Sequence, residues 1–279
     1  MAYSQEQLDA IQRQRQTPRW ARQIIAHDEL ESTNDLAKKL LADGAEEGTL
    51  VLADTQTRGK GRLGRSWFSE KGTGLYFSLI LKPALPREQH PSLTLMAAVA
   101  TVEALQPFSP HPITLKWPND ILLNQRKLGG ILSEQVLAPG DTVSGVVVGI
   151  GINVNQTRFP EELAAVATSL YIETREQPER SDIFSFIINY LYKYYQILLE
   201  DGASPILSRW RQNSRMLGSS ILLRQGAETH TGVAIDLDAA GRLVVRLNSG
   251  EVRAFDGGEV TLHPGSLPGT HQKKGPRRK

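Results

Sequence analysis

The chain of 279 residues contains no cysteine, only 6% aromatic residues and no long hydrophobic run. Without cysteine, the protein has no disulfide bond, no thiolate metal ligand and no cysteine nucleophile. No apolar run approaches the roughly 18 residues that a membrane-spanning helix needs. The N-terminus has neither the basic nor the apolar segment of a secretory signal. We therefore expect a cytoplasmic protein with no membrane partner.

An excess of charge of one sign is also absent, because 32 Lys and Arg residues oppose 30 Asp and Glu residues. Five of the positive charges lie in residues 264–279, which contain no acid, so residues 1–263 carry a net charge of −3. An acidic body with few aromatic residues is not typical of a nucleic-acid-binding surface. We expect no specific DNA partner and a disordered basic tail.

Hydrophobic periodicity predicts a protein that contains both strands and helices. Residues 49–53, 74–81 and 142–150 have strand character, and residues 92–105 and 181–199 have helical character. After residue 215 the pattern changes to five short apolar runs separated by glycines, which indicates a small β-barrel. We expect a helical N-terminal extension (1–21), a main domain (22–214), a β-domain (215–263) and a tail (264–279).

A glycine-rich basic loop, Q-T-R-G-K-G-R-L-G-R-S-W at residues 56–67, separates two of the predicted strands. Glycine permits positive φ angles, so successive backbone N–H groups can point into one concavity that binds an anion. The neighbouring Arg and Lys side chains can then close over a phosphate. The loop therefore predicts a phosphate-containing ligand.

Known phosphate-binding motifs do not fit this loop. The dinucleotide motif requires a helix directly after the glycines, and here a strand is predicted. The Walker A motif requires Ser or Thr after its lysine, but Gly61 follows Lys60. The strand and catalytic-loop motifs of protein kinases are absent. A solvated basic turn and an RNA-contacting loop remain as simpler alternatives.

Three other stretches combine polar residues with tight backbone geometry. S-T-N (32–34) begins a predicted helix, K-W-P-N-D (116–120) forms a corner that proline stiffens, and G-I-G-I-N (149–153) ends a buried strand. Each alone is commonly a helix cap, a turn or a strand end. Their combination with the glycine loop is more informative than any one of them.

In this order, and with K-L-G-G-I-L-S-E (127–134), the motifs resemble the catalytic domain of biotin protein ligases. The resemblance covers residues 22 to about 263. It implies an α+β, class II synthetase-like domain with helices on one face of a mixed or antiparallel sheet, followed by an SH3-like barrel. It also implies a two-step reaction. Biotin and Mg-ATP form biotinyl-5′-AMP, and a lysine of the biotin carboxyl carrier protein of acetyl-CoA carboxylase then accepts the biotin.

The resemblance also implies roles for individual residues. Lys116 and Arg62 are the expected catalytic cations, because bringing two anions together requires positive charge. The expected biotin-binding residues are Ser32, Thr33, Asn34, Gln56, Gly59, Lys60, Gly61, Arg62, Lys116, Gly130, Gly149 and Gly151. The expected ATP and adenylate residues are Arg62, Arg65, Trp67, Lys116 and Asn153.

The sequence shows no carboxylate cluster for a metal, so we expect no metal site in the protein and Mg²⁺ that arrives with ATP. Lys60 stands where most loops of this family have arginine, which keeps the charge and loses the bidentate geometry. We expect the loop to be mobile without ligand and to close over the adenylate as a lid.

Some members of the family carry an N-terminal DNA-binding domain, but 31 residues precede Ser32 here, so we expect no repressor activity. The family often forms homodimers, but no sequence pattern identifies a dimer surface. A lipoate or octanoate ligase or transferase of the same fold is one alternative function. A non-catalytic biotin sensor is another, although the cations at the phosphoryl site argue against it.

Overall fold

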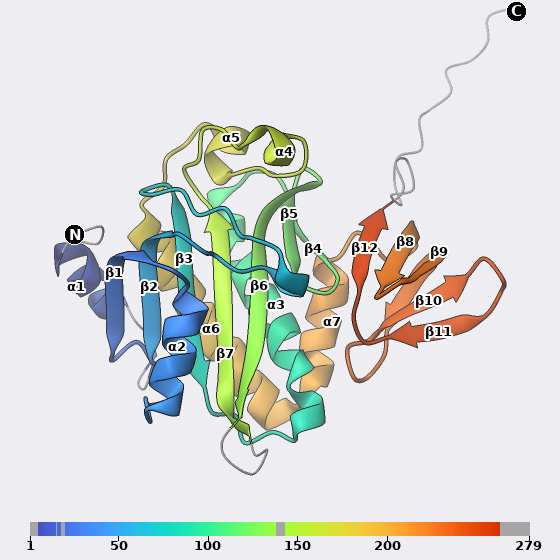
Figure 1. Ribbon diagram of the computed structural model, residues 1–279, viewed down its shortest axis with the longest axis horizontal. Helices are drawn as coiled ribbons and strands as arrows, with labels where there is room; N and C mark the ends of the chain where they lie inside the picture. The colour runs from blue at the N-terminus through green and yellow to red at the C-terminus, as the bar shows by residue number, and fades with distance from the viewer. Residues whose placement is uncertain (1–4, 15, 18–19, 138–142, 263–279) are drawn as a thin grey trace, which may run out of the picture.

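The computed structural model describes residues 5–14, 16–17, 20–137 and 143–262. Its larger part is a seven-stranded sheet in the order β1-β2-β3-β7-β6-β5-β4 (Figure 1). Only β1 and β2 pair in parallel among the neighbouring strands of this described sheet, so the sheet is mixed, as predicted. The strands are β1 (Ile24–Leu30), β2 (Leu50–Gln56), β3 (Gly74–Leu81), β4 (Ile113–Lys116), β5 (Asp120–Leu123), β6 (Arg126–Leu137) and β7 (Val143–Asn153).

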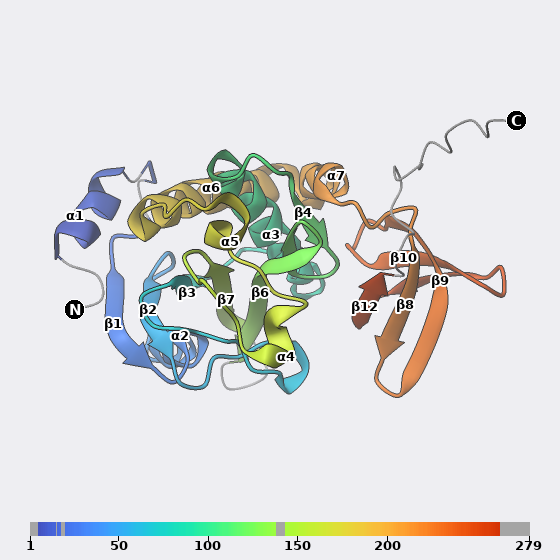
Figure 2. The same cartoon turned by 90° about the horizontal axis from the view of Figure 1, so that it is seen from above.

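Helices form one main layer on the sheet, and a single helix covers part of the opposite face (Figure 2). The main layer consists of α3 (Pro91–Leu105), α6 (Arg180–Asp201) and α7 (Ala203–Asn213). The opposite helix is α2 (Thr33–Ala42). The prediction of helices on one face therefore describes the main layer, and α2 adds a second, smaller one.

Strand β3 shows why the sheet is covered on both sides. All eight of its residues are buried, and its sequence is nearly continuously apolar, which is typical of strands buried on both faces. Phe77 packs edge-on against Phe184 of α6, with 4.9 Å between ring centroids. Ile80, on the other face, belongs to the apolar cluster that includes Ala37 and Leu41 of α2.

Helix α2 begins where the sequence predicted. The Ser32 side chain caps it by accepting a 3.5 Å hydrogen bond from the Asp35 backbone N–H. Gly44 follows its last turn with a φ angle of +95°, a conformation that favours glycine. The cap fixes Thr33 and Asn34 in the first turn, beside the sheet.

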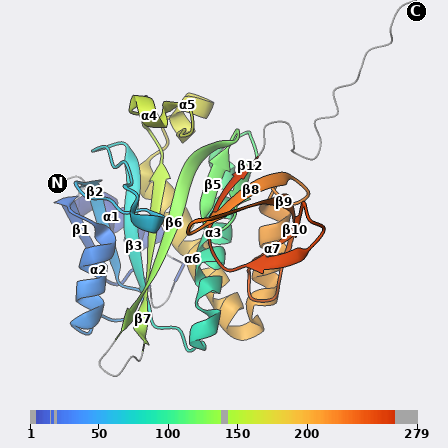
Figure 3. The same cartoon turned by 45° about the vertical axis from the view of Figure 1, so that its right-hand side comes forward.

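The C-terminal segment forms a separate five-stranded antiparallel sheet in the order β11-β10-β9-β8-β12, as the five apolar runs predicted. It lies next to α7 (Figure 3). A hydrogen bond from Trp117 Nε1 to the Gly241 carbonyl (3.1 Å) also joins it to the turn between β4 and β5. Its strands are β8 (Ser220–Gln225), β9 (Glu228–Leu237), β10 (Leu243–Leu247), β11 (Val252–Phe255) and β12 (Glu259–Leu262).

Three shorter helices complete the described chain. Helix α1 (Gln5–Gln14), which the sequence predicted, packs against α6. Helices α4 (Glu161–Ala164) and α5 (Leu170–Thr174) were not predicted, because four or five residues are too few to show a helical period. The proposed domain limits stay predictions, and the tail at 264–279 lies outside the described residues. Within the described ranges, none of the helices has both the length and the apolarity that a membrane crossing requires.

Candidate active site

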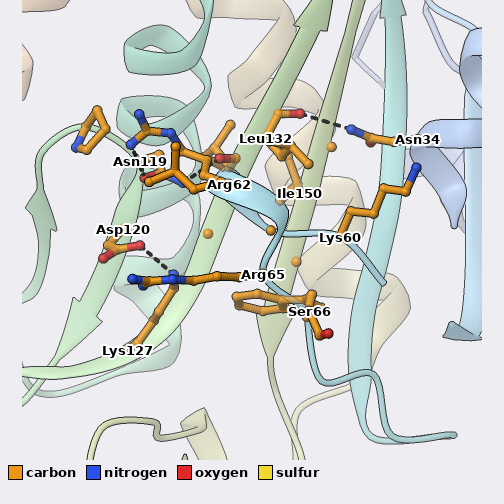
Figure 4. A pocket seen from close by; sticks show the side chains of 18 of the residues that line it. Asn34, Lys60, Arg62, Arg65, Ser66, Asn119, Asp120, Lys127, Leu132 and Ile150 are labelled. Atoms are coloured by element: carbon orange, nitrogen blue, oxygen red, sulfur yellow. Dashed lines mark hydrogen bonds and ion pairs between the residues drawn. The ribbon is translucent and has the colours of Figure 1, made fainter. Parts of the chain in front are cut away.

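A single open cleft brings the predicted motifs together. It lies between the first turn of α2, the glycine loop, the turn from β4 to β5, the middle of β6 and β7, and the C-terminal sheet (Figure 4). Of the residues expected to bind ligand, the following line it: Ser32, Thr33, Asn34, Gln56, Lys60, Gly61, Arg62, Arg65, Trp67, Lys116, Gly130, Gly149 and Gly151.

Two of the expected residues, Gly59 and Asn153, lie outside the cleft lining. The Asn153 side chain is buried and donates to the carbonyl of Thr168 at 3.0 Å, so its amide joins the end of β7 to the segment before α5. The Gly59 carbonyl accepts a 2.8 Å hydrogen bond from the Trp67 N–H, which closes the base of the glycine loop. Both positions therefore support the surroundings of the cleft.

One end of the cleft is neutral and densely hydrogen-bonded. Thr33 and Asn34 are each only 4% exposed. The Gln56 side-chain oxygen accepts from the Thr33 N–H at 2.8 Å. Ser78, which the sequence analysis missed, places its hydroxyl 2.6 Å from Asn34 Oδ1 and 2.8 Å from Thr33 Oγ1. These side chains fix one another, so this end is organised before any ligand arrives.

Glycines in β6 and β7 allow side chains to lie against the backbone of the sheet. A Cβ atom on Gly149 would lie 2.1 Å from Asn34 Oδ1, and one on Gly151 would lie 2.6 Å from the Trp67 indole. Gly130 pairs with Gly151 across the two strands, so the indole rests on a floor without side chains. Protein side chains lie against the backbone at Gly149 and Gly151, and the biotin contacts expected of these glycines stay a prediction.

The glycine loop forms a small hairpin across the cleft. Lys60 and Ser66 form an isolated β-bridge, and the Gly61 N–H donates to the Arg65 carbonyl at 2.7 Å. Leu63 and Gly64 at the tip have φ angles of +55° and +74°, and the turn depends on these left-handed conformations. The Leu63 side chain is exposed.

Arg62 and Arg65 connect this hairpin to the far side of the cleft. Arg62 Nη1 donates to Asn119 Oδ1 (3.3 Å) and to the Gly258 carbonyl (3.4 Å), and Arg65 forms an ion pair with Glu259. Burial lowers the pKa of Arg62, although the charge of Asp120 opposes this effect. Arginine still remains protonated, so Arg62 brings a partly desolvated cation to the cleft.

The cationic end of the cleft is built around Asp120. One carboxylate oxygen lies 2.9 Å from Lys116 Nζ, and the other lies 2.5 Å from Lys127 Nζ. Burial alone would raise the pKa of Asp120, but the two ammonium groups outweigh it and hold the pKa below its usual value of 3.8. The Lys127 ammonium also lies 5.4 Å from the centre of the Trp67 ring, at cation–π distance.

Asp120, Asn119 and Lys127 were not assigned as site residues from the sequence. Two of them stand inside K-W-P-N-D and the third begins K-L-G-G-I-L-S-E, so their motifs were noticed. The missing signal was spatial, because only the pairing of β5 with β6 brings Lys127 beside Asp120.

The described residues do not contain a group of three or more His, Asp or Glu side chains that could hold a metal ion. The two carboxylates that line the cleft are already paired, Asp120 with two lysines and Glu259 with Arg65. These side chains therefore do not fit a dedicated metal cage.

Comparisons with known protein families match two parts of the chain. Residues 27–153 match the biotin/lipoate A/B protein ligase family, and residues 216–262 match the biotin protein ligase C terminal domain. The two matches correspond to the main sheet and to the C-terminal sheet.

Individual relatives agree with these matches. The bifunctional ligase/repressor BirA of Bacillus subtilis is 41% identical over 81% of this chain and 70% of its own length. The biotin--[acetyl-CoA-carboxylase] ligase of Mycobacterium tuberculosis is 32% identical over 86% of this chain and 90% of its own. The structure of the biotin protein ligase from Aquifex aeolicus, in complex with biotin and ATP, superposes with a TM-score of 0.75 at 31% identity. The superposition covers 87% of this chain and 99% of the Aquifex aeolicus chain.

Proposed function

The chain belongs to the biotin/lipoate A/B protein ligase family as a biotin protein ligase, and from this premise we propose how its cleft divides the reaction. The enzyme ligates biotin to protein at the expense of ATP. Two relatives are named for acetyl-CoA carboxylase. We propose that the acceptor here is a lysine of the biotin carboxyl carrier protein of that enzyme.

The neutral end holds the biotin ring system in this proposal. A ureido ring offers one carbonyl and two N–H groups, so it needs a few directed polar partners in a buried slot. Thr33, Asn34 and Gln56 provide such groups. Gln56 accepts hydrogen bonds from Thr33, and Asn34 donates to the Leu132 carbonyl and to Glu134, so these bonds keep the side chains from turning. Glu134 is itself paired with Lys38, so its charge is not left unpaired near a neutral ring.

The cationic end receives the biotin carboxylate and the α-phosphate of ATP. A carboxylate oxygen attacks the α-phosphorus and forms a mixed anhydride, while the bond to the β-phosphate oxygen breaks and pyrophosphate leaves. Negative charge on the phosphoryl oxygens increases as this bond breaks. Lys116 and Lys127, which share one carboxylate between them, and Arg62 can offset that charge.

The second step needs little from the protein beyond position. The ε-amine of the acceptor lysine, once deprotonated, attacks the acyl carbon, and the bond to AMP breaks to leave an amide. No protein nucleophile takes part, which agrees with a cleft whose ionisable groups are cations and their partners. We propose that the glycine loop shields the anhydride from water until the acceptor arrives.

The observation that carries this proposal is the convergence of three cations from separate segments at one end of a cleft whose other end is neutral. Arg62 comes from the glycine loop, Lys116 from the end of β4 and Lys127 from β6. A protein that only sensed biotin would need no such charge at the position of the phosphoryl group.

The test is an assay of both half-reactions with the purified chain. Biotin and Mg-ATP should yield pyrophosphate, and adding an unmodified carrier domain should yield a biotinylated lysine. A carrier domain with that lysine replaced by arginine is the control. Release of pyrophosphate with lipoate or octanoate in place of biotin would favour the alternative substrate class, and binding of biotin without pyrophosphate release would favour a sensor.

Several finer features stay proposals. We expect Mg²⁺ to arrive on the phosphates of ATP, where it would neutralise the leaving pyrophosphate, because the described side chains form no cage for it. We also propose a cytoplasmic enzyme without repressor activity, although some relatives are named ligase/repressor. Operator-binding assays test the latter, and sedimentation with and without biotin tests homodimer formation.

A further inference from the structure

The Lys60 side chain leaves the glycine loop in the direction opposite to Arg62 (Figure 4). Its ammonium lies 2.7 Å from Asp35 Oδ1, in the first turn of α2. The side chains of Lys60 and Asp35 are 43% and 38% exposed, so this is a partly solvated ion pair between residues 25 positions apart.

Asp35 is itself held in place. The same oxygen lies 3.1 Å from Lys38 Nζ, and Lys38 also lies 2.8 Å from Glu134 Oε1 on β6. The other Glu134 oxygen accepts a 2.7 Å hydrogen bond from Asn34. Burial raises the pKa of Asp35, but hydrogen bonds from Lys60 and Lys38 lower it below the usual value, so the carboxylate stays charged at neutral pH.

The charges of this chain of contacts cancel. Two ammonium groups, on Lys60 and Lys38, meet two carboxylates, on Asp35 and Glu134. Among the described residues, Arg62 instead donates to a side-chain amide oxygen and a backbone carbonyl, both neutral. The charge of Arg62 is therefore available to a ligand, whereas the charge of Lys60 already has its counterpart in the protein.

The loop is thus attached on both sides of the cleft. Lys60 holds it to α2, and Arg65 holds it to Glu259 at the start of β12. These two attachments place Gly61 and Arg62 over the cleft between them.

We propose that Asp35 is a positioning residue that anchors the glycine loop through Lys60, and that Lys60 acts as a tether and not as a phosphate ligand. The proposal rests on the function argued above and adds a residue that no motif singled out. Loss of either partner should let the loop open more often, so that the biotinyl adenylate escapes faster.

The experiment is a double-mutant cycle on the release of the adenylate. The wild type, Asp35→Asn, Lys60→Met and the double variant are loaded with labelled biotin and Mg-ATP in the presence of pyrophosphatase. The free adenylate is then separated by rapid filtration over time. Each single variant should release it about threefold to fivefold faster, as expected for a partly exposed ion pair. The double variant should match the single variants, because all three lack the same contact.

Two further variants and a melting curve separate the tether from other effects. Lys60→Arg should restore the wild-type rate, since it keeps the ion pair. Asp43→Asn, at the other end of α2, should not change the rate, because within the described part of the chain Asp43 bonds only through its backbone N–H. Thermal unfolding checks whether Asp35→Asn acts by weakening the first turn of α2.

The outcomes are distinct. If the two substitutions acted independently, their effects would multiply, and the double variant would release the adenylate about tenfold faster or more. That result would show that Lys60 contacts the ligand, and it would overturn the tether. The tether would also be overturned if Asp35→Asn released the adenylate at the wild-type rate. It would be overturned as well if Asp35→Asn lowered the melting temperature while Lys60→Met left the release rate unchanged. If the wild type forms no adenylate at all, the proposed function itself is wrong.

Discussion

The two ends of the cleft are built on opposite principles. At the neutral end, Thr33 and Asn34 are buried, and their polar groups are bonded to other protein groups within the same compact region. At the cationic end, Arg62, Lys116 and Lys127 are partly exposed and come from three separate segments. The neutral end can recognise a shape without moving. The cationic end holds more positive than negative charge, which is useful only when an anion is present.

Of the substitutions considered, removal of Lys116 should have the largest effect on the cationic end of the cleft. The Lys116→Ala variant should release pyrophosphate about a hundredfold to a thousandfold more slowly at saturating substrates, because a cation at the reacting phosphorus is lost. Biotin binding, measured by calorimetry without ATP, should change much less. Lys39→Ala, on the exposed side of α2, is the matched control. A variant that lost biotin affinity and kept its maximal rate would place Lys116 at the wrong end.

A substitution at Arg62 tests whether the cationic end also retains biotinyl-AMP. The Arg62→Ala variant should release biotinyl-AMP about tenfold faster, since the lid would lose its charged contact with the adenylate. Labelling of bystander proteins in a mixture with the carrier would report this leakage. Arg58→Ala removes an exposed arginine of the same segment, which pairs at 3.3 Å with the exposed Glu31, and this variant should not leak. Labelling confined to the carrier by Arg62→Ala would contradict the shielding role.

Two glycine substitutions should separate the ends of the cleft. In Gly149→Ala the new methyl group would meet Asn34, and the KM for biotin should rise about tenfold. In Gly151→Ala it would meet the Trp67 indole, next to Lys127, and the KM for ATP should rise by a similar factor. Steady-state kinetics with each substrate varied in turn provide the measurement. Equal effects of both variants on both substrates would show that the cleft is not divided as proposed.

Asp120 should affect the stability of the fold, and this effect should depend on pH. Its pKa is below 3.8 in the folded protein, so it stabilises the fold above the pKa of the unfolded chain, about 4, and this contribution is lost as the pH falls through the lowered value. Asp120→Asn should therefore cost about 2 kcal/mol of unfolding free energy at pH 7. Urea unfolding at pH 7 and at pH 3 should show the difference from the wild type shrinking at the lower pH. A constant difference would mean that the ion pairs contribute nothing.

Prediction from the sequence worked well where local pattern decides structure. The apolar run of β3, the capping serine of α2 and the change of pattern before β8 all correspond to observed elements. Asn153 shows where such reasoning is insufficient. Its position at the end of a glycine-rich strand marked it for ligand binding, but the structure turns its amide toward the carbonyl of Thr168. The direction of a side chain at the end of a strand depends on the segments that pack beside it.

The sequence by itself determined the family, the two-step chemistry and the order of the elements, because motifs and periodicity are properties of neighbouring residues. The tertiary structure alone decided how the charges are distributed. Lys60 and Arg62 are two residues apart in a basic loop, and nothing local distinguishes them. One pairs with a carboxylate 25 residues away, and the other reaches a carbonyl 196 residues away. Electrostatic partners are chosen by distance in space, so only the folded chain separates the cation that anchors the loop from the cation that remains for the ligand.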